Sequence, residues 1–271
     1  MRTVLLATFE PIYRYRSLIT WNLRGQDASE LFKSVLGRLW HLIGPLTDML
    51  IYYFLVVIVF KARGIAGGPS PFVYIMLGLV HYNILSRCGT ATSTISQEEG
   101  ILKQIPIDPI VFMATHFLRI VRDTAWSFVV FAAFLLIFRP TLGLSILAYP
   151  LILTALLVFG WTLIVLVGTG GVYMRDLARF STMVMRILMY LSPVVYLSSF
   201  YPPVIREILF YTPFACLFGL LQWSVLSASL GDLAICPGWH HIAVLVLWIA
   251  VFFVVAHVFY ARSRAKFTKL F

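Results

Sequence analysis

Residues 140–174 read PTLGLSILAYPLILTALLVFGWTLIVLVGTGGVYM, and this stretch contains no Asp, Glu, Lys or Arg. A helix needs about 20 apolar residues to cross a bilayer, so the stretch is long enough to span one. In lipid every backbone polar group must be bonded within the protein, and a barrel would show short alternating segments instead. The continuous run therefore predicts a transmembrane helix, and the charge-free ranges 208–231 and 233–261 are apolar by the same criterion.

The composition extends this prediction to most of the chain. Hydrophobic residues make up 61% and charged residues only 12% of the 271 residues, whereas a soluble domain carries about a quarter charged residues. We therefore predict an all-α integral membrane protein with six transmembrane helices, a cytoplasmic N-terminal segment (1–35), a transmembrane domain (36–260) and a basic cytoplasmic tail (261–271). The six spans are expected at 39–60, 72–95, 110–138, 144–168, 181–200 and 242–260.

The stretch 203–230 is apolar but contains prolines, and the basic residues decide how it is interpreted. Lys and Arg collect in cytoplasmic loops, and both ends of the chain are basic, so both termini are expected in the cytoplasm. An even number of spans follows, which predicts a re-entrant hairpin between helices five and six rather than one more full span. The net charge of +10 is spread over several short segments, so it indicates topology and not nucleic-acid binding.

The segment 9–33 precedes the first span and has two distinct sides on a helical wheel. Its apolar side consists of Ile12, Tyr15, Ile19 and Leu23, and its polar side of Arg14, Ser17 and Arg24. This pattern predicts an amphipathic helix that lies in the membrane interface. The alternative is a basic, aromatic-flanked anchor for the first span.

Asp48 and Arg87 fall well inside the first two predicted spans. Asp48 and Arg87 would each cost about 2.5–3.5 kcal/mol at the centre of a membrane helix, so each must be paired, neutralised or exposed to water. The sequence allows an Asp48–Arg87 pair, and it also allows Arg119 and Asp123 to pair at the i, i+4 spacing.

The chain carries no motif of a hydrolytic or ATP-binding enzyme. HExxH, GxSxG and a paired-carboxylate motif are absent from the sequence, and no lysine follows a glycine as a phosphate-binding loop requires. His240 and His241 are adjacent, and successive helical residues point about 100° apart, so we do not expect them to form a metal pair. Any ATP used by this protein would have to bind to another chain.

Several short motifs resemble those of ABC-2 type polysaccharide export permeases, and they occur in the same order. Ser34 to Trp40 followed by Pro45 resembles the entry to their first span, and Phe72 to Leu79 the start of their second span. The other resembling motifs are Glu99 to Lys103 with Pro106 and Pro109, Arg175-Asp176, Ser192-Pro193-Val194, and Tyr211 to Phe214 at the place of an Asn-Pro motif. Together they cover about residues 30–225.

The resemblance implies a homodimer in the bacterial cytoplasmic membrane, bound to two copies of a cytoplasmic ATP-binding subunit. ATP and Mg²⁺ would be used by that partner, so this chain would bind no cofactor or metal and would not itself be an enzyme. The cargo would be a lipid-linked polysaccharide, and periplasmic export components would be further partners. The form of the Gly100–Pro109 segment favours capsular polysaccharide, with O-antigen next. An ABC-2 drug or lipid exporter is the alternative, followed by a membrane enzyme or channel without an ATPase.

The resemblance and the residue chemistry together assign candidate residues to three roles. Coupling to the ATPase is expected of Arg14, Arg16, Glu99, Gly100, Leu102, Lys103, Pro106 and Asp108. Aromatic rings stack on sugar faces and Arg87 would attract anionic sugars, so the substrate path is expected to include Asp48, Tyr52, Tyr53, Tyr82 and Arg87. Structural or gating roles are expected of Trp40, Pro45, Arg175, Asp176, Ser192, Pro193 and Pro213.

Overall fold

The computed structural model describes residues 2–33, 40–54, 58, 71–104, 107–174 and 176–270, and within these residues the regular structure is helical throughout. The α-helices are α1 (Arg2–Arg14), α2 (Arg16–Lys33), α3 (Trp40–Tyr53), α4 (Pro71–Gly89), α5 (Glu99–Gln104), α6 (Ile110–Phe138), α7 (Tyr149–Tyr173), α8 (Leu177–Leu191), α9 (Pro203–Phe210), α10 (Pro213–Leu230) and α11 (Trp239–Leu270). Short 3-10 helices are η3 (Ser96–Glu98), η4 (Leu144–Ala148), η5 (Ser198–Phe200) and η6 (Gly231–Leu233). The predicted all-α class is confirmed for this part of the chain.

Four helical segments of the described residues are long and apolar enough to cross a membrane. They are Ile110–Phe138, Leu144–Tyr173, Pro213–Leu233 and Trp239–Arg264. Three of them coincide with predicted spans, and the fourth lies in the predicted hairpin. Only 17% of the best window of Trp239–Arg264 is buried in the bundle, against 72% for Pro213–Leu233. The last helix therefore offers most of its surface to lipid or to a partner, whereas α10 is an internal element.

The predicted span at 181–200 is wrong in its second half. The helix α8 ends at Leu191, and Ser192 is extended with φ −101° and ψ 152°. The cause is Pro193, which lacks a backbone N–H and pushes the residue before it out of the helical region. The 15 residues of α8 rise about 22 Å, which is shorter than a bilayer core of about 30 Å. The predicted count of six spans stays a prediction.

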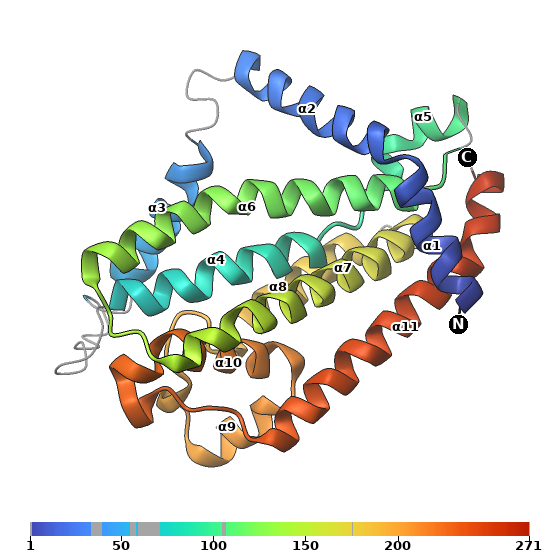
Figure 1. Cartoon of the computed structure of the whole chain (residues 1–271). Coiled ribbons are helices and arrows are strands. Elements are labelled where there is room, and N and C mark those ends of the chain that lie inside the picture. The colour runs from blue at the N-terminus through green and yellow to red at the C-terminus, as the bar shows by residue number, and fades with distance from the viewer. Residues whose placement is uncertain are drawn as a thin grey trace.

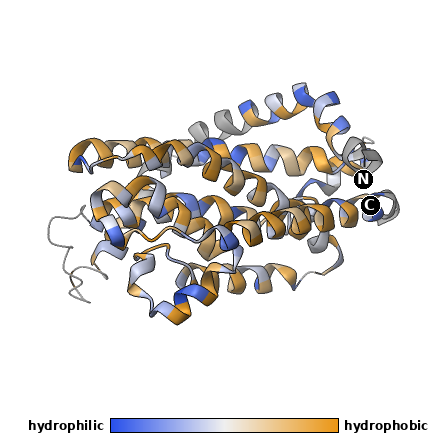
Figure 2. Cartoon of the chain, turned by 60° about the horizontal axis from the view of Figure 1, so that its bottom comes forward, coloured by the Kyte–Doolittle hydropathy of each residue, from blue (hydrophilic) through white to orange (hydrophobic). Residues whose placement is uncertain are grey.

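The two ends of the chain lie at the same end of the bundle. Figure 1 shows α1, α5 and the C-terminal part of α11 together, with α9 far from them near the N-terminal end of α11. Contacts of α1 with both α6 and α11 agree with this arrangement. Figure 2 shows that hydrophobic residues dominate the long helices of the bundle. A common side for both termini matches the topology predicted from the basic residues, and the assignment of that side to the cytoplasm stays a prediction.

The helix α4 forms the centre of the bundle. It contacts α3, α6, α7, α8 and α10, and its residues from Val73 to Tyr82 are all buried. Gly78 makes one of these contacts possible, because a Cβ atom there would lie 1.6 Å from the carbonyl oxygen of Val194. The backbone that follows Pro193 therefore packs directly onto α4, which no side chain larger than glycine would allow.

The N-terminal residues form two helices, α1 and α2, with a turn at Tyr15. The predicted apolar side packs against the bundle: Ile19 is 3% exposed, and Ile12, Tyr15 and Leu23 are half-buried against the core. Arg14, Ser17 and Arg24 are exposed. The two sides are thus separated as the sequence pattern requires, and the position of these helices in a membrane interface stays a prediction.

Candidate functional site

A buried carboxylate joins the segment before α6 to the C-terminal part of α11. Asp108 Oδ1 accepts hydrogen bonds from the Ile110 N–H at 3.2 Å and from the Tyr260 hydroxyl. The Tyr260 oxygen accepts a second bond from the same N–H at 3.0 Å. Arg264 Nε lies 2.6 Å from Asp108 Oδ2. Because the Asp108 side chain is 4% exposed and Tyr260 is 1% exposed, this joint is held by contacts that water does not replace.

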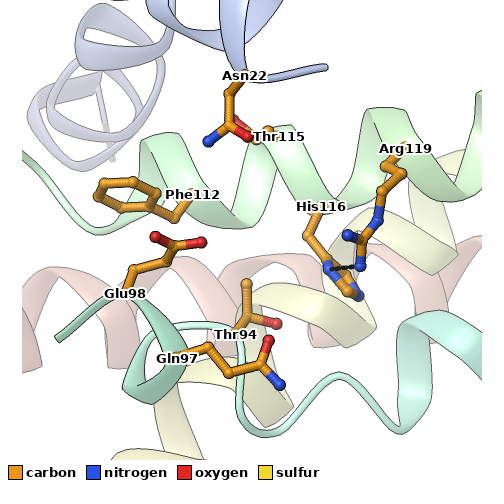
Figure 3. Close-up of a pocket in the computed structure, with 8 residues that line it drawn as sticks. All are labelled: Asn22, Thr94, Gln97, Glu98, Phe112, Thr115, His116 and Arg119. Carbon is orange, nitrogen blue, oxygen red and sulfur yellow. Dashed lines mark hydrogen bonds between the residues drawn. The ribbon is translucent and has the colours of Figure 1, made fainter. Parts of the chain in front are cut away.

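A polar pocket lies between α2, the η3 turn and the first half of α6 (Figure 3). Its lining residues are Asn22, Thr94, Gln97, Glu98, Phe112, Thr115, His116 and Arg119. Arg119 Nη2 lies 3.1 Å from His116 Nδ1. Burial raises the pKa of the Glu98 carboxyl, and the Arg119 guanidinium partly offsets this rise. The pocket brings the N-terminal helices and the 97–109 segment, the two elements expected to couple to an ATPase, onto one surface of α6.

The charges inside the predicted spans do not pair as the sequence suggested. Arg87 Nη2 on α4 lies 2.8 Å from Asp123 Oδ2 on α6, and Arg122 Nη2 lies 3.1 Å from Asp123 Oδ1. Asp48 is exposed on α3. Neither pairing that the sequence allows, Asp48 with Arg87 or Arg119 with Asp123, is among the ion pairs of the described residues. Packing of α4 on α6 instead brings Arg87 to a carboxylate that is 5% exposed. Two guanidinium groups on one carboxylate leave this cluster with a net positive charge.

Arg122 also ties this cluster to the N-terminal helices. Its Nη1 donates a hydrogen bond of 3.0 Å to the Leu23 carbonyl oxygen on α2. A carbonyl in the middle of a helix has a spare lone pair for such a bond. One arginine therefore links α2 to the charged middle of α6.

The predicted path tyrosines lie mainly against other helices. The Tyr52 hydroxyl donates to Met189 Sδ at 3.4 Å, and the buried Tyr82 hydroxyl donates to the Met185 carbonyl at 2.7 Å, so both contact α8. The ring of Tyr53 stacks on Phe72, with 3.7 Å between centroids. Of the predicted path residues, Asp48 and Tyr82 are near enough to Tyr52 to interact electrostatically with its hydroxyl. Tyr53 instead lies against Phe72, and Arg87 pairs with Asp123.

The predicted coupling residues divide into an exposed and a buried group. Arg14, Arg16 and Gly100 are exposed, and Leu102 is half-buried against the core. Glu99 and Lys103 lie in α5 with side chains outside the described residues, as does the whole of Pro106. Asp108 instead points into the bundle, so its contacts are with this chain.

The predicted structural residues are mostly at helix ends. Trp40 begins α3 and is 55% exposed, and Pro45 lies within that helix with its side chain outside the described residues. Asp176 is exposed before α8, whereas Arg175 lies outside the described residues. Pro213 is the first residue of α10, and the Thr212 hydroxyl caps this helix by accepting from the Ala215 N–H.

Sequence reasoning missed the residue that holds the Pro193 segment. Gln222 of α10 is 1% exposed. Its Nε2 donates to the carbonyls of Pro193 at 2.9 Å and Tyr196 at 2.7 Å, and its Oε1 accepts from the Ser198 N–H at 3.0 Å. The available signal was a lone amide in an apolar run, because a buried amide must find partners.

A second missed cluster lies at the other end of α11. Nε2 of His240 and Nε2 of His241 each lie 3.2 Å from Glu207 Oε1 on α9. The two rings therefore lie together against Glu207, although successive helical residues point about 100° apart. His240 is in the first turn of α11 and its ring folds back over Gly238, where a Cβ atom would be 2.7 Å from His240 Cε1. The two ring centroids are 4.0 Å apart.

Comparisons with known proteins show the family of this chain. A model of the ABC-2 type transporter family matches residues 18–226, from α2 into α10. Two proteins from Klebsiella pneumoniae, each called "O-antigen export system permease protein RfbA", are 26% identical to this chain over 211 and 212 residues, which is 74% of this chain and 76% of each relative. The family match covers most of the chain. It includes all the motifs that carried the resemblance, the last of which contain Pro193 and Pro213. This multi-pass membrane protein therefore belongs to the ABC-2 type transporter family.

Proposed function

We propose that this chain is the membrane subunit of an ATP-driven exporter that moves a lipid-linked polysaccharide across the bacterial inner membrane. The observation that carries the proposal is the likeness to two O-antigen export permeases over about three quarters of the chain, in line with the family match. The sequence has no phosphate-binding loop of its own. Two copies of an ATP-binding subunit, with Mg²⁺, would supply the energy to a homodimer of this chain.

The contact with the ATP-binding subunit would be made by the exposed side chains at the end that holds both termini. Arg14 ends α1 and Arg16 begins α2, and their side chains are exposed, as is Gly100 of α5. Figure 1 shows α1 and α5 at that end of the bundle. Asp108 would act one step further in, by fixing the end of that segment to Tyr260 and Arg264 of α11. A displacement of α5 by the ATPase would then reach the longest helix through a buried joint rather than through a loose loop.

The glycan would cross between the two chains of the dimer rather than through one chain. Apolar lipid does not solvate a polysaccharide, so its route must be lined by polar and aromatic groups. The Arg87–Asp123–Arg122 cluster has an excess of positive charge, and the Arg87 side chain is 43% exposed. This cluster would attract an anionic sugar or a diphosphate linkage. Tyr52 and Tyr82 would contribute only after α8 moves, since both now contact that helix. Tyr53 would contribute only after its ring leaves Phe72.

The segment 203–230 would form an outer gate that re-enters the membrane. The break between α9 and α10 at Tyr211–Thr212 and the bonds from Gln222 to the Pro193 segment support this proposal. Gln222 would hold the gate closed against α4, because its three partners lie in the segment that packs on Gly78.

The first experiment is co-purification of the tagged chain in mild detergent from its native membrane, followed by mass spectrometry. We expect a stoichiometric partner that contains a phosphate-binding loop. Absence of such a partner in several detergents would contradict an ATP-driven mechanism and favour a channel or a membrane enzyme.

The second experiment separates the two candidate cargoes. The relatives' names favour O-antigen, and the form of the Gly100–Pro109 segment favours capsular polysaccharide. Deletion of the gene should abolish one surface polymer while its lipid-linked precursor accumulates in the inner leaflet. Loss of neither polymer would contradict polysaccharide export and leave a drug or lipid as the cargo.

A further inference from the structure

The outer end of α11, the end far from both termini, carries three potential metal ligands from two helices. Glu207 belongs to the short helix α9, and His240 and His241 belong to the first turn of α11. The carboxylate oxygen and the two imidazole nitrogens all lie within 4.8 Å of one another. The side chains of Glu207 and His240 are 57% and 43% exposed, whereas His241 is 2% exposed. The cluster is thus open on one side and closed on the other.

The spacing of these atoms suits a small divalent ion. Zinc binds imidazole nitrogen at about 2.0–2.1 Å and carboxylate oxygen at about 2.0–2.2 Å. In a tetrahedral site such donors lie about 3.3 Å from one another. The two nitrogen-to-oxygen separations here are both 3.2 Å. If the two imidazole rings moved closer together, the carboxylate oxygen and the two ring nitrogens would occupy three corners of such a tetrahedron.

The state of His241 is a second, independent observation. Its Nε2 atom is buried and makes no hydrogen bond, although it lies 3.2 Å from Glu207 Oε1. The close approach is therefore not aligned for donation. A buried polar atom without a partner is costly and needs an explanation, and a metal ion at the mouth of the cluster would use the lone pair of this nitrogen.

The other ring nitrogen imposes one condition. The Gly238 N–H donates to His241 Nδ1 at 3.1 Å, and an imidazole that binds a metal through Nε2 carries its proton on Nδ1. Metal binding would therefore break the hydrogen bond between the Gly238 N–H and His241 Nδ1. Gly238 directly precedes α11, and N–H groups at a helix N-terminus are commonly satisfied by water.

We propose that Glu207, His240 and His241 bind a divalent transition-metal ion of the zinc class, with water in the open position. Imidazole ligands favour Zn²⁺, Cu²⁺ and Ni²⁺, whereas Mg²⁺ and Ca²⁺ prefer oxygen ligands alone. The ion would fasten α9 to the start of α11. This inference does not depend on the identity of the exported cargo or on the ATPase.

The test uses the full chain, purified in detergent without a polyhistidine tag and stripped with a chelator. ZnCl₂ is then titrated by calorimetry, and bound zinc is counted by mass spectrometry. We expect one zinc ion per chain and a higher unfolding temperature in its presence, with no such effect of MgCl₂. Loss of a supporting group around a metal already weakens affinity by about 10–100-fold, so His240→Ala, His241→Ala and Glu207→Gln should each weaken it at least about tenfold.

Two controls make the result decisive. Asp232→Asn removes another exposed carboxylate, in η6, and should leave zinc binding unchanged. His240→Ala alters a partly exposed ring, so size-exclusion elution like that of the unmodified chain would show that it folds. Equal zinc affinity in the unmodified chain and in His240→Ala would overturn the proposal, and so would failure of the unmodified chain to bind zinc more tightly than magnesium.

Discussion

The two ends of α11 hold carboxylates from other elements in opposite ways. At the end near the termini, Tyr260 and Arg264 hold Asp108, whose side chain is 4% exposed. At the outer end, His240 and His241 face Glu207, whose side chain is 57% exposed. The same helix thus ends in a buried joint on one side and in an open cluster on the other.

The difference indicates which end can change partners. Asp108 has hydrogen bonds and an ion pair in a dry environment, where a broken contact leaves a buried charge. Asp108 Oδ2 and His241 Nε2 both make no hydrogen bond, but Oδ2 has its ion pair with Arg264. The outer cluster is open to solvent through Glu207 and His240, so water or an ion can enter it. We expect the first end to transmit motion and the second to exchange ligands.

The largest effect is expected from Asp108→Ala. It leaves the Tyr260 hydroxyl without its acceptor and Arg264 without its counter-ion, and it should lower the free energy of unfolding by about 3 kcal/mol, the lower end for a broken buried pair because Arg264 is half-exposed. Denaturant titration of the purified chain in detergent measures this. A loss no greater than that of the surface variant Asp232→Asn would show that the joint does not stabilise the fold.

Tyr260→Phe should have the next largest effect. It removes one hydroxyl from a buried bond to a carboxylate and keeps the ring packing, so a loss of about 2 kcal/mol is expected. The same titration checks it. In the complex with the ATPase, ATP hydrolysis should continue while export falls, and an equal fall of both activities would contradict a role of Tyr260 in transmission.

Arg264→Gln should weaken the joint less. Glutamine carries its amide nitrogen at the position of Arg264 Nε, so the buried Asp108 carboxylate keeps a donor. The Arg264 side chain is also 47% exposed, so water reaches this side of the pair and we expect a loss of about 1 kcal/mol or less. The effect should shrink further at high salt. Titrations at two salt concentrations measure both quantities, and a loss as large as that of Tyr260→Phe would mean that the ion pair, and not the hydroxyl, holds Asp108.

The smallest effect on stability is expected from Glu207→Gln when no metal is present. Its carboxylate is mostly exposed, so the change should be about 0.5 kcal/mol or less. Addition of ZnCl₂ should then raise the unfolding temperature of the unmodified chain only, because only this chain gains stability by binding the ion. Thermal unfolding with chelator and with ZnCl₂ provides the comparison, and a large loss in chelator would make Glu207 a structural ion-pair partner instead.

Local sequence was sufficient for the class of fold and for several helix positions. The helix at 149–173 and the start of α11 follow from apolar runs that are long and free of charge, and the helix at 110–138 follows from an apolar run whose charges are confined to residues 119–123. A helix satisfies its own backbone in lipid and needs no neighbour to do so. The two sides of the N-terminal segment, with Ile19 inward and Arg24 outward, follow from the helical periodicity of its apolar residues, which is also a local property of the sequence.

Tertiary structure decided where the charges and amides find partners. Asp48 and Arg87 are both visible in the sequence, yet Arg87 pairs with Asp123 because α4 packs on α6. The Asp108–Tyr260 bond and the Glu207–His241 approach join residues far apart in the chain. The sequence by itself therefore determined that this protein is helical and lies in a membrane, because those properties depend on neighbouring residues. Only the packing of helices decided which polar groups meet, because such pairs depend on distances between elements that no local pattern records.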